Sequence, residues 1–309
     1  MKLMMQVISF VLPGIFGLLA VGWFTLVERK VLGYIMTRKG PNKVGFLGLM
    51  QPMSDGAKLF SKEMLVPMYS NFVPFLVCPV VTFFIALLLW LLYPFHSSEG
   101  VFMCGVLFYL ANSGANVYGV MVAGWASNSK YALLGAMRAM AQSISYEVSM
   151  ALVLLSCVFM VGSMHLQSIK LWQEKSLFIV GVAILPCFVV WLISMLAETN
   201  RAPFDFVEGE SELVSGFNVE YSSGGFALIY MAEYSNMLFN SLFTCAMFLG
   251  TSDAMMVGQA WLFLFFFLWA RGTFPRFRYD MLMSLAWKTF LCLVLGLSLF
   301  ISMVIYILA

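Results

Sequence analysis

Acidic side chains are concentrated in one stretch of this sequence, between Ala197 and Tyr221, where Arg201 is the sole base. Six of the chain's 15 acidic residues lie there: Glu198, Asp205, Glu208, Glu210, Glu212 and Glu220. Two carboxylates about 6 Å apart repel by roughly 2.8 kcal/mol at an effective dielectric of about 20. We therefore expect some of them to hold protons near neutral pH and to titrate as a coupled group, which suits the stretch to storing or passing protons.

Apolar residues interleave with these acids, and they decide between two interpretations of the run. A solvated acidic loop without function is the alternative to a proton-handling segment. The interleaved side chains favour a segment buried against another surface; they are Phe204, Phe206, Val207, Leu213, Val214 and Phe217.

Two further acids, Glu147 and Glu233, stand in or at long apolar stretches. A charged carboxylate at the centre of a bilayer costs about 2.5 to 3.5 kcal/mol unless it is paired, hydrated or protonated, so both are candidates for a proton path. A purely structural, hydrogen-bonded acid is the alternative. Polar residues accompany them and predict a hydrated seam: Tyr234, Asn236 and Asn240 beside Glu233, and Asn112, Ser113, Asn116 and Tyr118 in another apolar stretch.

The elements that hold these residues must be membrane helices. The chain has 309 residues, 62% hydrophobic and 10% charged, with a mean hydropathy of +0.92, which excludes a soluble globule and a disordered chain. Its apolar runs are long and lack the alternation of barrel strands. We expect an all-α polytopic bundle, one domain over 1–309, with about eight spans: 3–26, 72–93, 101–122, 142–162, 177–197, 222–247, 255–270 and 284–308.

Basic residues indicate how the bundle is oriented. With the first long loop inside, inner loops and helix edges hold 14 of the 17 Lys and Arg residues, and the other side keeps Lys2, Lys170 and Lys175. This asymmetry predicts that both termini lie on the outer side. The first apolar run is too long for a signal peptide core, so we interpret it as the first span.

The first inner loop, about Glu28 to Asn71, is the longest. It contains the turn signal Gly40-Pro41-Asn42 and a stretch, Gln51–Glu63, that predicts a short amphipathic helix at the membrane interface. Topology alone is an alternative explanation for its basic residues. A further inner cluster pairs Arg271, Arg276 and Arg278 with Asp280, and it could supply counter-charges for the acidic run or only anchor the last span.

No cofactor motif accompanies these acids. Six isolated cysteines and two histidines, His96 and His165 in short polar connections, give no pattern typical of a zinc, haem or iron–sulfur site. The sequence contains no Walker A or G-x-G-x-x-G motif. The net charge of +2 predicts no nucleic-acid partner. Because the motifs are missing, we also expect no metal and no covalently bound cofactor, so any electron chemistry resides in partner subunits.

Four long strings carry a resemblance to a known family: ERKVLGYIMTRKGPNKVGFLGLMQPMSDGAKLFSKE (28–63), GWASNSKYALLGAMRAMAQSISYEVSMAL (124–152), LAETNRAPFDFVEGESELVSGFNVEY (196–221) and RGTFPRFRYDMLMSLAWK (271–288). In this order the chain resembles the subunit 1 family of respiratory complex I, the NADH:ubiquinone oxidoreductase, in its mitochondrially encoded form. The resemblance implies a multi-pass subunit of the mitochondrial inner membrane, with both termini on the intermembrane-space side. It implies that ubiquinone is the substrate. It implies that the partners are membrane lipids, hydrophilic quinone-site subunits and neighbouring membrane-arm subunits. FMN and iron–sulfur clusters are then expected only in partner subunits.

The resemblance also implies roles for individual residues. To the quinone tunnel and its entrance it assigns Glu28, Arg29, Arg38, Asp55, Lys58, Glu63 and Phe226. To the loop beneath the quinone chamber it assigns Glu198, Arg201, Asp205, Glu208, Glu210, Glu212 and Glu220, with Arg278 as a counter-charge. Glu147 and Glu233 become members of a proton path, and Met36 departs from the Gln more usual in the family.

Two other classes remain as alternatives. A membrane subunit of an energy-converting hydrogenase shares the acidic-loop logic without quinone, although the retained RKGPN motif (38–42) disfavours it. A free-standing cation or proton antiporter is the second, although such transporters often have repeated halves and no internal repeat is evident here.

Overall fold

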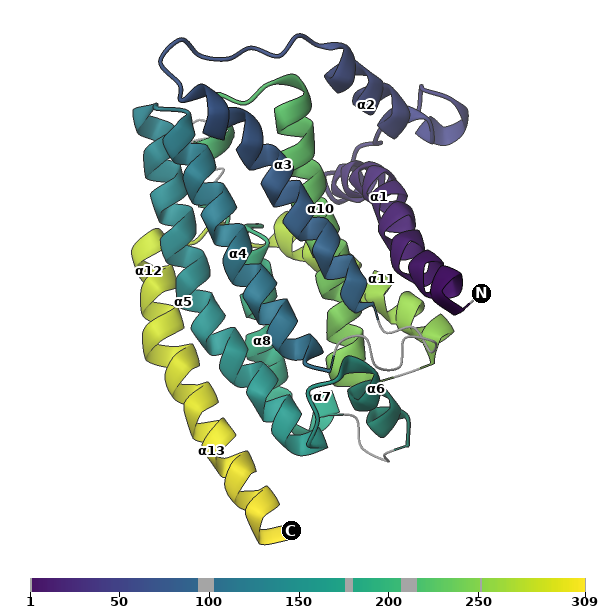
Figure 1. Ribbon diagram of the computed structural model, residues 1–309, viewed down its shortest axis with the longest axis vertical. Coiled ribbons are helices and arrows are strands. Elements are labelled where there is room, and N and C mark those ends of the chain that lie inside the picture. Colours follow the sequence, from purple (N-terminus) through teal and green to yellow (C-terminus); the bar gives the residue numbers. More distant parts are fainter. Residues whose placement is uncertain (1, 94–102, 176–179, 207–215, 251, 309) are drawn as a thin grey trace.

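The structure, a computed structural model, describes residues 2–93, 103–175, 180–206, 216–250 and 252–308. Every regular element in these ranges is a helix, which confirms the all-α class (Figure 1). The α-helices are α1 (Lys2–Ile35), α2 (Gln51–Ser61), α3 (Phe72–Leu89), α4 (Gly105–Ala126), α5 (Lys130–Val161), α6 (Leu166–Lys175), α7 (Val180–Ala183), α8 (Leu185–Glu198), α10 (Ser223–Thr244), α11 (Asp253–Thr273), α12 (Tyr279–Ser284) and α13 (Leu291–Leu308). Short 3-10 turns lie at Phe46–Gly48, Trp90–Leu92 and Gly216–Asn218, and π-helical turns at Cys245–Leu249 and Leu285–Phe290.

Five helical segments among the described residues have the length and apolar composition needed to cross a membrane: Phe72–Leu92, Gly105–Ala126, Lys130–Val161, Met255–Thr273 and Tyr279–Ile307. They correspond to five of the eight predicted spans. The other three predicted spans overlap α1, α8 and α10, so helix is confirmed there, while the total of eight spans stays a prediction.

Helices α3, α4 and α5 pack side by side, with α10 against α3 and with α8 and α13 against α5 (Figure 1). Two glycines of α4 allow its close approach to its neighbours. A Cβ atom at Gly119 would lie 2.3 Å from the Thr82 Cγ2 atom, and one at Gly124 would lie 2.3 Å from the Ala136 Cβ atom. Small residues at contacts of this kind let membrane helices pack backbone to backbone.

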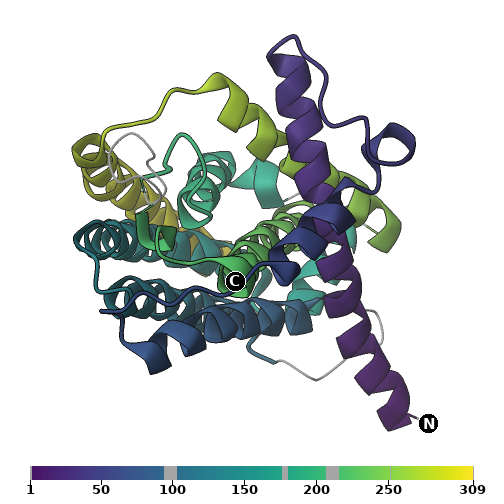
Figure 2. The ribbon, with the colours of Figure 1, turned by 90° about the horizontal axis from the view of Figure 1, so that it is seen from above.

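Helix α1 lies at one edge of the bundle, where it contacts α2, α10 and α11 (Figures 1 and 2). Its buried side chains include Val21, Phe24 and Leu26, which face the bundle, and Glu28 follows them on the same helix. The chain thus buries an acid at the point where α1, α10 and α11 meet.

Helix α2 confirms the predicted helix in the first inner loop, although it ends at Ser61 and not at Glu63. The Ser223 hydroxyl lies 3.1 Å from the Leu59 carbonyl oxygen and 2.6 Å from that of Lys62, so it can donate to either one at the end of the helix. No residue of α2 is buried, and its placement at the membrane interface stays a prediction.

The part of the chain that follows α5 contains a short helix with buried polar residues. Residues 166–175 form helix α6, in which Gln167, Lys170 and Gln173 are buried. The Gln173 amide donates to the Met247 carbonyl oxygen at 2.6 Å, which ties α6 to the π-helical turn after α10. The sequence alone does not indicate this burial, because three polar residues in a short connection resemble a solvated loop.

Candidate functional site

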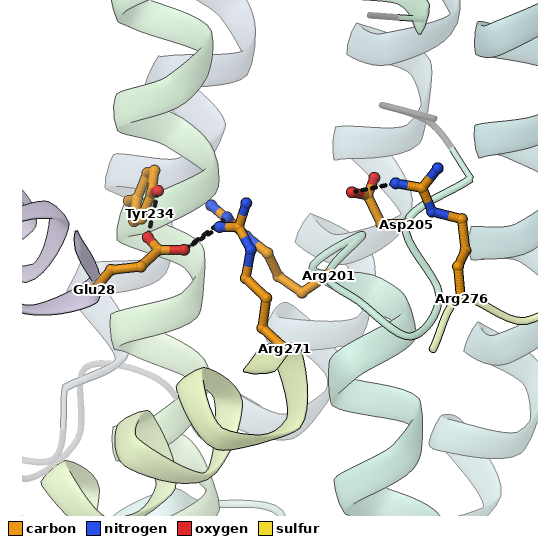
Figure 3. Close-up of polar contacts among 6 residues, drawn as sticks. All are labelled: Glu28, Arg201, Asp205, Tyr234, Arg271 and Arg276. Atoms are coloured by element: carbon orange, nitrogen blue, oxygen red, sulfur yellow. Dashed lines mark hydrogen bonds and ion pairs between the residues drawn. The ribbon is translucent and has the colours of Figure 1, made fainter. Parts of the chain in front are cut away.

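Glu28 is the centre of a buried ionic cluster (Figure 3). Glu28 is 4% exposed, and its Oε1 atom pairs with Arg201 Nη1 at 3.4 Å and with Arg271 Nη1. The Tyr234 hydroxyl donates to Glu28 Oε2 at 2.6 Å, and the Arg201 guanidinium lies over the Tyr234 ring, 4.4 Å from its centroid. One carboxylate and two guanidiniums leave an excess positive charge, and the guanidiniums can donate hydrogen bonds to a ligand oxygen.

The segment after α8 positions Arg201 for this contact. The backbone nitrogen of Arg201 donates to the Leu196 carbonyl oxygen at 3.2 Å, so the chain turns sharply at the end of the helix. From α5, the fully buried Gln142 amide donates to the carbonyl oxygens of Ala197 (2.9 Å) and Phe204 (3.0 Å). Gln142 therefore clamps both ends of the turn that carries Arg201, a role that its position in an apolar helix did not indicate.

A cavity of about 490 Å³ lies beside the cluster, between α1, α2 and α10. Its lining is mainly apolar, with the ionic cluster on one wall: Leu18, Val21, Gly22, Thr25, Glu28, Arg29, Leu32, Pro52, Asp55, Gly56, Leu59, Phe60, Phe226, Ala227, Tyr230, Met231, Tyr234 and Arg271. Its volume is within the range of pockets for small organic ligands. Such a cavity can hold an apolar molecule that carries hydrogen-bond acceptors at one end.

A second ion pair lies on the α2 side of the cavity. Arg29 Nη1 contacts Asp55 Oδ2 at 2.6 Å, with side chains 52% and 28% exposed, and the Gln51 amide donates to Asp55 Oδ1 at 3.0 Å. The ion pair joins α2 to α1 at the cavity wall, and the Gln51 bond orients Asp55 within α2.

Four of the residues predicted for a quinone tunnel line this cavity together: Glu28, Arg29, Asp55 and Phe226. The Phe226 ring contacts that of Tyr230, with centroids 4.3 Å apart. The other three, Arg38, Lys58 and Glu63, are exposed and are not among the described residues that line it.

Two small polar cavities form a second candidate site, and Glu198 lines both of them. The first, of about 40 Å³, is also lined by Glu233, and the second, of about 30 Å³, by Glu147. Asn116 and Asn200 line both cavities as well. Glu198 therefore shares one cavity with Glu233 and the other with Glu147.

The predicted polar seam is only partly made of the residues proposed for it. Asn116, Asn236 and Asn240 line the first cavity. Asn112 instead donates to the Ile85 carbonyl oxygen at 2.9 Å, and Tyr118 is 70% exposed on the outside of the bundle. The prediction that Tyr118 belongs to the seam was therefore wrong, because its side chain lies on the exposed face of α4.

Fully buried Tyr109 takes part instead, although nothing in the sequence distinguished it from a core aromatic. Its hydroxyl lies 3.1 Å from Glu198 Oε2 and 3.2 Å from Asn240 Oδ1. The Asn240 amide donates to the same Glu198 oxygen at 3.2 Å. One carboxylate oxygen of Glu198 is therefore bonded to α4 and α10.

The acidic run is described only at its two ends. Glu208, Glu210 and Glu212 lie outside the described residues, whereas Glu220 is half-buried between Asn218 and α10. The apolar residues of the run that are described, Phe204, Phe206 and Phe217, are buried, as predicted.

Basic residues of the 271–288 cluster reach this run. Arg276 Nη2 lies 3.6 Å from Asp205 Oδ2, which confirms that the cluster supplies a counter-charge (Figure 3). The described ion pair of Arg278 is with Asp280, at 3.3 Å between Nε and Oδ2, and both side chains are exposed. The role of Arg278 as a counter-charge for the acidic run stays a prediction.

Comparison with known proteins defines the class. The sequence profile of the NADH dehydrogenase family matches residues 7–302, so the chain belongs to this family. A protein of Aedes aegypti named NADH-ubiquinone oxidoreductase chain 1 is 52% identical over 100% of this chain and 99% of its own length. Proteins of the same name from Anopheles gambiae (54% identical, 94% of this chain and 93% of the relative) and Mytilus edulis (50%, 94% and 95%) are also similar. The resemblance stated from the sequence motifs is confirmed.

Proposed function

We propose that this chain is a membrane-arm core subunit of a proton-pumping NADH:ubiquinone oxidoreductase, and that it forms the entry tunnel for ubiquinone. The relatives named above support the enzyme, and the cavity beside Glu28 supports the tunnel. In this proposal the subunit crosses the mitochondrial inner membrane eight times, as a single domain with both termini on the intermembrane-space side.

One observation carries the tunnel: a mainly apolar cavity has a buried, positively charged donor cluster on its wall. A quinone combines an apolar tail with carbonyl oxygens that accept hydrogen bonds. The apolar lining suits the tail, while Arg271 and Tyr234 can donate to the head group. The Arg29–Asp55 pair and Phe226 would then border the path that the quinone follows.

The cavities beside Glu198 support a route from the quinone chamber to the pumping subunits. The first is large enough for water, and the Oδ1 atoms of Asn200 and Asn236 in its lining have no hydrogen-bond partner among the described residues. Water there would connect Glu233 with Glu198, and the second cavity would connect Glu198 with Glu147. Protonation of these acids, and of the acidic run up to Glu220, would couple quinone reduction to proton translocation.

The remaining parts of the reaction belong to partners in this proposal. FMN and iron–sulfur clusters would deliver electrons from hydrophilic subunits that cover the inner face, where Met68, Tyr69 and Phe46 expose most of their surface. Neighbouring membrane-arm subunits and lipids would cover the exposed apolar side of α13. The hydrogenase alternative is disfavoured because the full-length relatives carry the name of a ubiquinone oxidoreductase.

Labelling the assembled enzyme with a photoreactive short-tailed quinone tests the tunnel. We expect adducts on the cavity lining, at Phe226, Tyr230 or the α2 segment, and we expect an excess of unlabelled ubiquinone to suppress them. Adducts confined to partner subunits would contradict the tunnel assignment. The exposed Tyr306 on α13 is the control position, because a lipid-facing residue should be labelled without competition.

The coupling route is tested separately with Glu233→Gln and Glu198→Gln. Each variant keeps the side-chain size and removes the titration, so NADH should still reduce a hydrophilic acceptor while quinone-linked turnover or pumping falls. Unchanged pumping in both variants would contradict the route.

A further inference from the structure

Three side chains from three helices form a closed hydrogen-bond triangle around one oxygen of Glu198. The distances are 3.1 Å from Tyr109 Oη to Glu198 Oε2, 3.2 Å from Tyr109 Oη to Asn240 Oδ1, and 3.2 Å from Asn240 Nδ2 to Glu198 Oε2. The Tyr109 hydroxyl carries one proton but faces two oxygen acceptors, with the weaker Met150 Sδ acceptor at 4.0 Å, so it can donate to only one of them at a time.

We propose that the Tyr109 hydroxyl is a two-position donor that allows Glu198 to take up or release a proton while all three side chains stay in place. This proposal rests on the proposed function, in which Glu198 handles protons, and adds the residues that regulate it.

The proton count can be followed at each atom. When Glu198 is ionised, Tyr109 and the Asn240 amide both donate to Oε2. When a proton binds Oε2, the carboxyl becomes a donor to the Tyr109 oxygen, and the Tyr109 O–H turns to Asn240 Oδ1. One O–H bond forms on Glu198, none breaks on Tyr109 or Asn240, and the proton is exchanged through the cavities that Glu198 lines.

Packing holds the triangle rigid enough for this exchange. Tyr109 and Asn240 are fully buried, and the Tyr109 ring stacks on Phe243 with centroids 4.1 Å apart. The Thr244 hydroxyl donates to the Asn240 carbonyl oxygen at 2.7 Å and accepts from the Trp191 indole at 3.1 Å. Because buried polar groups without partners are costly, a network that satisfies both charge states lowers the barrier to changing between them.

Other titratable groups face Glu198 and must be distinguished from the triangle. They are Tyr109 itself from α4, Glu147 from α5 and Glu233 from α10, the last two across the shared cavities. A test that leaves both acids unchanged while altering the triangle separates its contribution from theirs.

Tyr109→Phe in the assembled enzyme is the direct test. The variant removes the donor to ionised Glu198 and the acceptor for protonated Glu198, and the bond to the charged form is the stronger one. We expect kcat for a short-tailed ubiquinone to fall about tenfold, with KM unchanged. The acid-side midpoint of the pH profile should move up by about one unit. NADH oxidation by a hydrophilic acceptor measures the amount of assembled enzyme.

Tyr221→Phe is the matched control. Tyr221 is also buried and its hydroxyl donates to a backbone carbonyl oxygen, that of Ala123, at 3.3 Å. Burial raises the pKa of Tyr221, so its hydroxyl stays neutral and exchanges no proton with its partner. This variant loses one hydrogen bond of similar length and should keep the pH profile of the unaltered enzyme.

Asn240→Leu provides a second test, should Tyr109→Phe fail to assemble. It removes the amide that donates to ionised Glu198 as well as the second acceptor of Tyr109. Because the bond to the charged form is the stronger one, this variant should also lower kcat and move the pH profile upward. An unchanged pH profile in either assembled variant would overturn the two-position donor, even if the enzyme were less stable. Normal turnover and pumping in Glu198→Gln would instead overturn the role of Glu198 itself, so the two failures are distinguishable.

Discussion

Replacing Glu28 by Gln should destabilise the assembled enzyme strongly, because it removes the one negative charge of the buried cluster while keeping the side-chain size. Arg201, which is 8% exposed, would lose its ion pair with Glu28 and remain desolvated. At 3.4 Å and an effective dielectric of about 20, the pair attracts by about 5 kcal/mol. Breaking a buried pair by removing one partner costs about 3 to 5 kcal/mol.

The same chemical change at the cavity's other ion pair is the control. Asp55→Asn removes the carboxylate that Arg29 contacts at 2.6 Å, but the Arg29 side chain is 52% exposed and water can replace its partner. An exposed pair of this kind contributes about 1 kcal/mol or less. Burial, and not the distance between the charges, therefore decides the difference between the two variants.

Thermal inactivation of quinone-linked turnover in the assembled enzyme measures both variants. We expect the midpoint of inactivation to fall by on the order of 5 °C or more for Glu28→Gln and by only about 1 °C for Asp55→Asn. Added salt should weaken the Arg29–Asp55 contact and leave the Glu28 cluster nearly unchanged. Equal losses in the two variants, or a strong salt effect on the Glu28 cluster, would refute the reasoning from burial.

Two further predictions concern packing and the acidic run. Gly124→Ala should lower the yield of assembled enzyme on native gels, because the new Cβ atom would lie 2.3 Å from that of Ala136 and overpacking costs about 1 to 3 kcal/mol. Gly296→Ala, where the new atom meets nothing within 4 Å, should leave the yield normal. Asp205→Asn should reduce turnover only modestly and make it less sensitive to salt, because the Arg276 and Asp205 side chains are 36% and 16% exposed and their contact is partly open to water. A loss of most of the quinone-linked turnover would contradict this.

Composition and hydropathy were enough to predict the helical class and the approximate positions of the helices, because bilayer thickness fixes how many consecutive apolar residues a span needs. The partners of Glu28 could not be predicted in the same way. Arg201 and Arg271 are 173 and 243 residues away from it in the chain, and charge spacing along one sequence carries no information about such contacts. Arg271 and the basic residues near it were predicted as possible counter-charges, but for the acidic run and not for Glu28.

Tyr109 and Tyr118 illustrate what helix geometry adds. Nine residues separate them on α4, which is two and a half turns, so their side chains lie on opposite faces of the helix. Tyr109 faces the bundle and contacts Glu198, whereas Tyr118 is exposed. Only one of them could belong to the polar seam, and the choice requires knowing which face of α4 meets α5 and α10.

The cavity and the polar seam meet in one short segment, which bears on how they could be coupled. Glu198 and Arg201 are three residues apart at the end of α8, and the Gln142 amide holds the carbonyl oxygens of Ala197 and Phe204 on either side of them. Arg201 pairs with Glu28 on the cavity wall, while Glu198 lines the seam. A quinone that changed the electric field at Arg201 would therefore act on a short turn whose two ends are held by the same Gln142 side chain. A movement at one end would strain the hydrogen bond at the other, so this turn alone could couple the cavity to the seam.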